Sequence, residues 1–153
     1  DVFPGVRLVT SGTYASLWVD EGGAPRAPQV RDSLRAMLPE ADVWLREEVP
    51  ERFHYSADPR IGDIVALAAP GSLVIPKGRS LPSEPYTHGW DNQALGMGAI
   101  FLARGPDIKA GIRIEAFESV HVYPLMAHLL GLRPNPKADG RLEVLAPILE
   151  APN

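Results

Sequence analysis

The first part of the chain alternates between short apolar runs and turn residues. Val6 to Thr10 and Tyr14 to Val19 are rich in β-branched and aromatic side chains, and Ser-Gly-Thr separates them, which predicts a β-hairpin. Beyond Pro28, apolar side chains recur at helical spacing until Pro39. This spacing predicts a helix that covers one face of a sheet. The apolar positions of that helix are Val30, Leu34, Met37 and Leu38.

Further strands are predicted after this helix. Asp42 to Glu47 alternates apolar and polar positions, which is typical of a strand with two different faces. The runs Ile64 to Ala68 and Leu73 to Ile75 flank Ala-Pro-Gly-Ser and predict a second hairpin. We therefore expect residues 1–76 to form a small α+β subdomain of strands with one covering helix.

The second part, residues 77–153, has a different pattern. Ala99 to Ala103 is apolar and ends in Arg-Gly-Pro, which predicts a buried strand. A helix is expected from about Val122 to Leu130, with Pro124 tolerated only in its first turn and Gly131 as its C-terminal cap. The tail from residue 134 is expected to wrap the surface. The predicted apolar stripe of the helix is Val122, Leu125, Met126, Leu129 and Leu130.

Composition and charge exclude several classes of protein. The 153 residues suit a globular core, since 45% are hydrophobic, and the 16 prolines and 14 glycines indicate many short elements joined by turns. The formal net charge of −4 argues against a nucleic-acid duplex or an anionic membrane as partner. No apolar run approaches the length of a membrane span, and the lack of cysteine excludes thiolate zinc sites.

The candidate chemistry lies in Thr-His-Gly-Trp-Asp-Asn, residues 87–92. This pattern predicts a loop that presents the imidazole of His88. A neutral imidazole is a good zinc donor, and Gly89 leaves room for the backbone to approach a metal. A lone loop histidine is more often a solvated side chain than a ligand, so the residues alone leave both interpretations open.

This segment and three others resemble the C-terminal part of the nucleotide pyrophosphatase/phosphodiesterases, also called type I phosphodiesterases, in the alkaline phosphatase superfamily. Order, spacing and residue types agree over about fifty residues, which is more specific than a short motif. The resemblance extends upstream, more loosely, through Gly-Thr-Tyr-Ala, Pro-Glu-Arg-Phe-His-Tyr and Asp-Pro-Arg-Ile-Gly-Asp. The three further segments of the main match are residues 99–109, 117–126 and 129–132.

The resemblance implies an α/β fold, α+β for this portion in isolation, and a two-zinc hydrolase. Such an enzyme cleaves phosphodiester or pyrophosphate bonds of small molecules or nucleotides through an upstream threonine, and His88 would complete one zinc site. The nucleophile and most metal ligands would precede Asp1. We therefore expect a C-terminal fragment with no catalytic residue of its own, inactive and without bound zinc. The family expectation for location is periplasmic or secreted.

Three neighbours of His88 are candidate supporting residues. Asp91 or Asn92 would hold the other ring nitrogen of the imidazole, as outer partners of metal ligands commonly do. The family usually has tyrosine where Trp90 stands, so this chain keeps an aromatic pocket wall without the hydroxyl. Of the other histidines, His54 is interpreted as a structural residue packed between subdomain and core. His121 and His128, seven residues apart, are too far apart to share a metal at helical spacing, and His128 is interpreted as a partner of the helix dipole.

Two alternatives remain open from the sequence. A phosphonate hydrolase or another two-metal phosphatase of the superfamily can share this layout. The chain can also be a non-catalytic α+β interaction module. In isolation we expect self-association, because a strand edge and the apolar face of the helix that begins near Val122 would lack cover.

Overall fold

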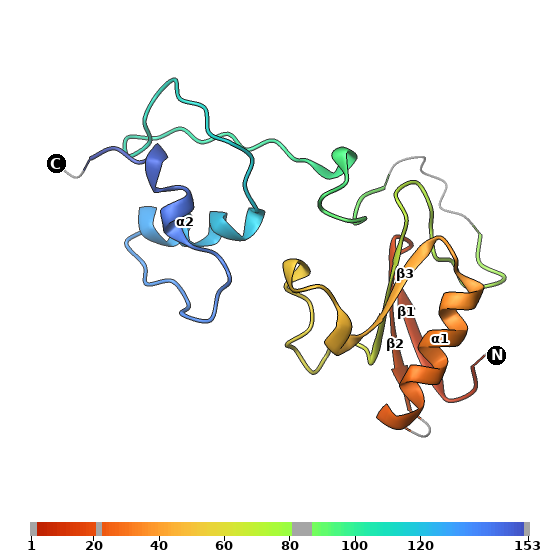
Figure 1. The fold of residues 1–153 in the computed structure, drawn as a ribbon. Coiled ribbons are helices and arrows are strands. Elements are labelled where there is room, and N and C mark those ends of the chain that lie inside the picture. The colour runs from red at the N-terminus through yellow and green to blue at the C-terminus, as the bar shows by residue number, and fades with distance from the viewer. Residues whose placement is uncertain (1–2, 21–22, 81–86, 152–153) are drawn as a thin grey trace. The chain divides into compact units, whose positions relative to one another are not determined.

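The structure, a computed structural model, describes residues 3–20, 23–80 and 87–151. Contacts divide the chain into two compact units, Asp1–Ala99 and Ile100–Asn153 (Figure 1). The division falls after Ala99, so the segment that carries His88 lies in the first unit. The subdomain boundary predicted at residue 76 refers to the architecture of a larger core and stays a prediction.

The first unit is built on a four-stranded antiparallel sheet with the order β1-β2-β4-β3. β2 and β4 are therefore the interior strands. The predicted first hairpin is confirmed, since β1 and β2 pair from Val6 opposite Val19 to Thr10 opposite Ala15. The strands are β1 Val6–Thr10, β2 Tyr14–Val19, β3 Ala41–Leu45 and β4 Ile64–Ala68.

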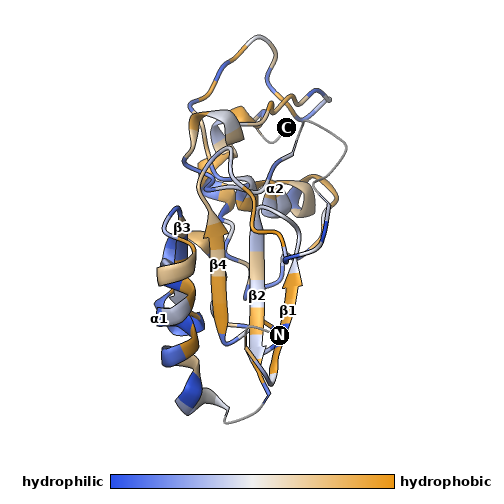
Figure 2. Cartoon of the chain, turned by 90° about the vertical axis from the view of Figure 1, so that its right-hand side faces the viewer, coloured by the Kyte–Doolittle hydropathy of each residue, from blue (hydrophilic) through white to orange (hydrophobic). Residues whose placement is uncertain are grey.

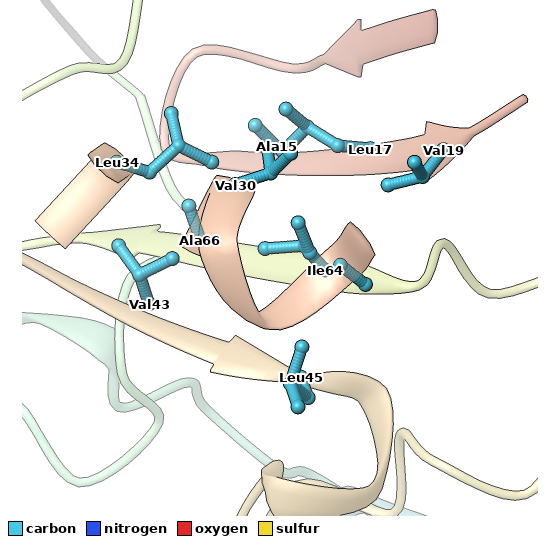
Figure 3. Close-up of a cluster of buried hydrophobic side chains, with 10 residues drawn as sticks. Ala15, Leu17, Val19, Val30, Leu34, Val43, Leu45, Ile64 and Ala66 are labelled. Atoms are coloured by element: carbon cyan, nitrogen blue, oxygen red, sulfur yellow. The ribbon is translucent and has the colours of Figure 1, made fainter. Parts of the chain in front are cut away.

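Helix α1, Ala27–Met37, covers one face of this sheet, as the sequence predicts. Pro28 lies in its first turn, and the helix ends before Pro39. Figure 3 shows side chains from α1 and from β2, β3 and β4 converging in one apolar cluster. Met37, expected in the apolar set, is instead exposed. The buried cluster comprises Ala15, Leu17, Val19, Ala27, Val30, Leu34, Val43, Leu45, Ile64 and Ala66.

The opposite face of the sheet carries a second, smaller cluster of Val49, Ile61 and Val65, with aromatic side chains packed against it. β3 supplies both faces as predicted, because Val43 is buried in the α1 cluster and Trp44 packs on the second cluster. The strand ends at Leu45, two residues before the prediction, where Arg46–Glu48 form a 3₁₀ turn. Figure 2 shows that apolar residues dominate β1 and β4, whereas much of α1 is hydrophilic.

The predicted second hairpin is wrong. β4 pairs with β2 on one side and with β3 on the other, so neither of its edges is free for Leu73 to Ile75. That segment instead bonds to the turn between β1 and β2. The Val74 amide donates to the Gly12 carbonyl (2.6 Å), and the Val74 carbonyl accepts from the Thr10 hydroxyl (3.0 Å).

The second unit contains helix α2, Val122–Leu129, whose predicted position is confirmed. Pro124 lies in its first turn. Gly131 caps its end at φ +64°, and the Leu132 amide donates to the Ala127 carbonyl (2.8 Å), which closes a Schellman motif. The tail does more than wrap the surface, because its 3₁₀ turns contribute Leu145 and Ile148 to a buried cluster with Leu125.

Two predictions about apolar residues near and within the second unit are wrong. Ala99 to Ala103 does not form a strand, and the side chains of Ile100 and Leu102 are 88% and 89% exposed. A strand needs a backbone partner, and the described residues place none beside this run. The predicted stripe of α2 is only partly buried, since Met126, Leu129 and Leu130 are exposed.

No helix in the described stretches combines the length and the apolar character that crossing a bilayer requires.

The close approach of Gly62 to β2 gives a test of the fold. A Cβ at Gly62 would lie 2.6 Å from the Leu17 carbonyl oxygen and 2.8 Å from its nitrogen, so Gly62→Ala must displace backbone. We expect a loss of about 1–3 kcal/mol in the free energy of unfolding, measured by denaturant titration. Gly96→Ala is the control, because a Cβ there meets nothing within 4 Å. Equal stability of the two variants would contradict this packing.

Candidate functional site

His88 lies on a segment that is fixed through its backbone and exposed through its side chain. The Thr13 hydroxyl donates to the His88 carbonyl (3.1 Å). Thr13 is 2% exposed, and its own carbonyl accepts from the Ala68 amide (2.8 Å), so it belongs to the end of the sheet. The imidazole of His88 is exposed. The sheet therefore positions the residue while its ring stays accessible.

Gly89 is required by both backbone conformation and space. Its φ is +99°, a region that residues with a side chain rarely adopt, and a Cβ there would lie 2.8 Å from the Thr13 hydroxyl oxygen. The same hydroxyl binds the His88 carbonyl. A larger residue at position 89 would therefore disturb the contact that holds His88.

Trp90 ties the segment to the turn after β4. Its indole Nε1 donates to the Ser72 carbonyl (2.8 Å), which satisfies the polar edge of a half-buried ring. The rest of the ring faces a cleft. Trp90 thus supplies an aromatic wall next to His88, while the outer-shell and pocket roles proposed for positions 90–92 stay predictions.

Asp91 and Asn92 are held by Arg52. The guanidinium donates to both carboxylate oxygens of Asp91 (2.7 and 2.5 Å) and to the Asn92 side-chain oxygen (3.0 Å). The hydrogen bonds from Arg52 hold the pKa of Asp91 below its usual range, and those to Asp91 raise the pKa of Arg52. Paired, planar geometry of this kind is among the stronger polar contacts in proteins.

A cleft of about 270 Å³ lies on the sheet face opposite α1. Its lining is mainly aromatic and apolar. Tyr14 and Tyr55 meet edge to face with 6.1 Å between ring centroids, and the hydrogen bond between their hydroxyls (3.5 Å) raises the pKa of Tyr14. The lining residues are Tyr14, Trp44, Val49, Phe53, Tyr55, Val65, Leu67, Gly89 and Trp90.

The described residues do not form a metal site by themselves. No group of three or more histidine, aspartate or glutamate side chains in residues 3–20, 23–80 and 87–151 is arranged to hold an ion. Among these residues, His88 is therefore not part of such a group.

The other histidines have different surroundings. His121 is 8% exposed, and its Nδ1 accepts from the Arg141 amide (3.0 Å), which is a structural role. His128 is exposed in the last turn of α2. His54 adopts φ +49° at the end of a 3₁₀ turn and is exposed.

The comparisons with known proteins decide the family. A sequence model described as type I phosphodiesterase / nucleotide pyrophosphatase matches residues 5–91, which is more than half of the chain. The chain belongs to this phosphodiesterase family. The match covers the whole sheet of the first unit and ends at Asp91, so it contains His88 and Arg52.

Characterised members of the phosphodiesterase family are similar in sequence. Ectonucleotide pyrophosphatase/phosphodiesterase family member 7 of Homo sapiens is 39% identical over 94% of this chain and 30% of the relative. Bis(5′-adenosyl)-triphosphatase ENPP4 of Bos taurus is 34% identical over 71% of this chain and 23% of the relative. The chain thus spans less than a third of the length of these curated relatives.

Solved structures of the phosphodiesterase family are similar in fold. Human ectonucleotide pyrophosphatase/phosphodiesterase 5 superposes with a TM-score of 0.78 at 30% identity, covering 96% of this chain and 38% of that one. An inactive murine form in complex with AMP gives a TM-score of 0.73. The predicted fold class, mixed sheet and helix of the alkaline-phosphatase-like kind, is confirmed.

Sequence reasoning missed two residues of the site. Thr13 and Arg52 both lie in segments that carry the family resemblance, but nothing in their local pattern indicates that they contact residues 88–92. Thr13 is 75 residues from His88, and Arg52 is 39 residues from Asp91. The three-dimensional fold was needed to bring them together.

The contact between Gly89 and Thr13 can be tested with two matched glycines. We expect Gly89→Ala to destabilise the chain more than Gly78→Ala. Both positions have a positive φ, of +99° and +88°, but a Cβ at Gly78 meets nothing within 4 Å. The difference in unfolding free energy isolates the clash with Thr13. Amide hydrogen exchange should also rise in residues 87–92 of the Gly89 variant alone. Similar exchange in both variants would contradict the contact.

The pairing of Asp91 with Arg52 predicts a pH dependence. The pKa of Asp91 is lower in the folded than in the unfolded state. Its ionised form therefore stabilises the fold at pH values above the unfolded-state pKa, and this stabilisation is lost as the pH falls through the folded-state pKa. We expect NMR titration to place the Asp91 pKa below 3.8, and Arg52→Ala to raise it. An Asp91 pKa that does not change in the variant would contradict the pairing.

Proposed function

We propose that this chain is part of a two-zinc phosphodiesterase or nucleotide pyrophosphatase, and that His88 supplies one ligand to one of the zinc ions. The observation that carries the proposal is the exposed imidazole of His88 on a backbone tied to the sheet, within the segment that the family model matches. A metal ligand must be both accessible and held in place, and His88 meets both conditions.

The chemistry divides between this chain and the rest of the proposed enzyme. When bound, zinc would polarise phosphoryl oxygens and assist an oxygen nucleophile. The nucleophilic threonine and the other ligands would lie outside this sequence. From this chain, His88 would donate a ring lone pair, and Gly89 would keep the approach free of a side chain. The contact from Thr13 uses the His88 carbonyl and leaves the ring nitrogens out of that bond.

The names of the relatives support phosphate esters of small molecules as substrates. One relative is a bis(5′-adenosyl)-triphosphatase, and one similar structure contains AMP. We propose nucleotides or other small phosphodiesters as the substrate class here. Because one histidine cannot hold zinc with useful affinity alone, we expect the 153-residue chain by itself to be inactive.

The proposal predicts a strong effect of His88 on metal binding. In the complete protein that contains this sequence, we expect His88→Ala to lose zinc from one site, measured by elemental analysis after dialysis. Hydrolysis of bis(4-nitrophenyl) phosphate should fall at least about 100-fold, beyond the usual effect of losing an outer partner of a ligand.

His128→Ala is the matched control for that experiment, because this histidine is also exposed but lies at the end of α2. It should keep both zinc and activity. A His88 variant that retains full zinc content would contradict the ligand role. A complete protein without zinc or hydrolase activity would contradict the proposed function as a whole.

A further inference from the structure

Arg52 stacks on an aromatic side chain that packs against the sheet. It lies in the 3₁₀ turn Glu51–Phe53, and its guanidinium carbon lies 4.0 Å from the centroid of the Phe53 ring. That ring packs on Trp44 of β3, with 5.9 Å between centroids. A guanidinium over an aromatic face loses much of its rotational freedom. Arg52 therefore offers its donors from a fixed position.

Asp91 also accepts hydrogen bonds from within its own turn. Asp91 Oδ1, besides accepting from Arg52, accepts from the Gln93 amide (2.8 Å), and the Asp91 carbonyl accepts from the Ala94 amide (2.9 Å). These local bonds shape the turn after Trp90 whether or not Arg52 is present. The local bonds do not attach the turn to the sheet. The contacts from Arg52 do, and they fix the position of the turn relative to the sheet.

Contacts thus fix the backbone on both sides of Gly89. Thr13 holds the carbonyl of His88 before the glycine, and Arg52 holds Asp91 and Asn92 after it. Glycine is the residue with the greatest backbone freedom, so the segment can pivot at Gly89. The bond from the Trp90 indole to Ser72 and the contacts from Arg52 together oppose such a pivot. The contact between Arg52 and Asp91 is charged and bidentate. The two side chains are only about one-third exposed, Arg52 at 33% and Asp91 at 28%.

We propose that Arg52 is a positioning residue for His88, which acts through Asp91 and Asn92 to hold the imidazole where it meets the metal. This inference rests on the proposed function of His88. A ligand that is ordered before the metal arrives does not lose conformational entropy on binding, so removing the hold weakens the metal without removing a ligand. Losing an outer support of this kind typically lowers metal affinity about 10- to 100-fold.

The test uses the complete protein with the variants Arg52→Ala and Arg52→Lys. Zinc affinity is measured by competition with a chelator at defined free zinc, together with kcat and KM for bis(4-nitrophenyl) phosphate. We expect Arg52→Ala to bind one zinc about 10- to 100-fold more weakly and to recover its kcat in excess zinc, with KM little changed. Arg52→Lys should fall between parent and alanine variant, because lysine keeps the charge but not the two-pronged geometry.

Arg60→Ala is the matched control. Arg60 forms the same kind of ion pair with Asp58 (2.7 Å), which holds the pKa of that aspartate at about 2, and its side chain is 88% exposed. This variant should bind zinc as the parent does. In addition, the loss of zinc affinity in the double variant Arg52→Ala with Asp91→Ala should be smaller than the sum of the two single losses, because both changes remove the pair between Arg52 and Asp91.

Each other outcome is decisive. If Arg52→Ala binds zinc as tightly as the parent, or if Arg60→Ala is equally impaired, the positioning role is wrong. The same holds if excess zinc does not restore kcat. Should Arg52→Ala fail to fold, Arg52→Lys decides, since parental zinc affinity in that variant overturns the inference. A parent protein whose zinc does not depend on His88 overturns the proposed function, and this inference with it.

Discussion

The pairing of β2 with β4 is the constraint on which the first unit depends. Both are interior strands, so each has its backbone bonded on two sides, and their side chains divide between two faces. One face is buried under α1. The other carries the aromatic cleft beside the His88 segment. Thr13, directly before β2, reaches the carbonyl of His88, so the position of the candidate ligand follows from that of the sheet.

The candidate site combines one exposed imidazole with a well-anchored backbone. Hydrogen bonds from Thr13, Trp90 and Arg52 join residues 88–92 to three separate parts of the sheet unit. The contacts from Thr13 and Trp90 are neutral, whereas the contact from Arg52 is an ion pair with Asp91. This arrangement explains how a loop residue can be both accessible and ordered. A metal site to which this chain supplies one ligand would require both properties.

The sequence predicted the secondary-structure elements that are determined by neighbouring residues in the chain. The β1–β2 hairpin, helix α1 and the Gly131 cap of α2 all follow from spacing, turn residues and proline placement. It failed where the outcome depends on a distant partner. The run Ala99 to Ala103 has strand composition but no strand beside it among the described residues, and the pairing of β4 left no edge for a second hairpin. The Arg52–Asp91 contact has no local signal for the same reason.

The most direct test is a crystal structure of the complete protein grown with zinc, with the metal located by anomalous scattering. We expect a zinc ion about 2.0–2.1 Å from a ring nitrogen of His88, with the remaining ligands from residues outside this sequence. Arg52 should still pair with Asp91, and Thr13 with the His88 carbonyl. Zinc bound at a site that leaves the His88 ring without metal would contradict the assignment of His88 as a ligand.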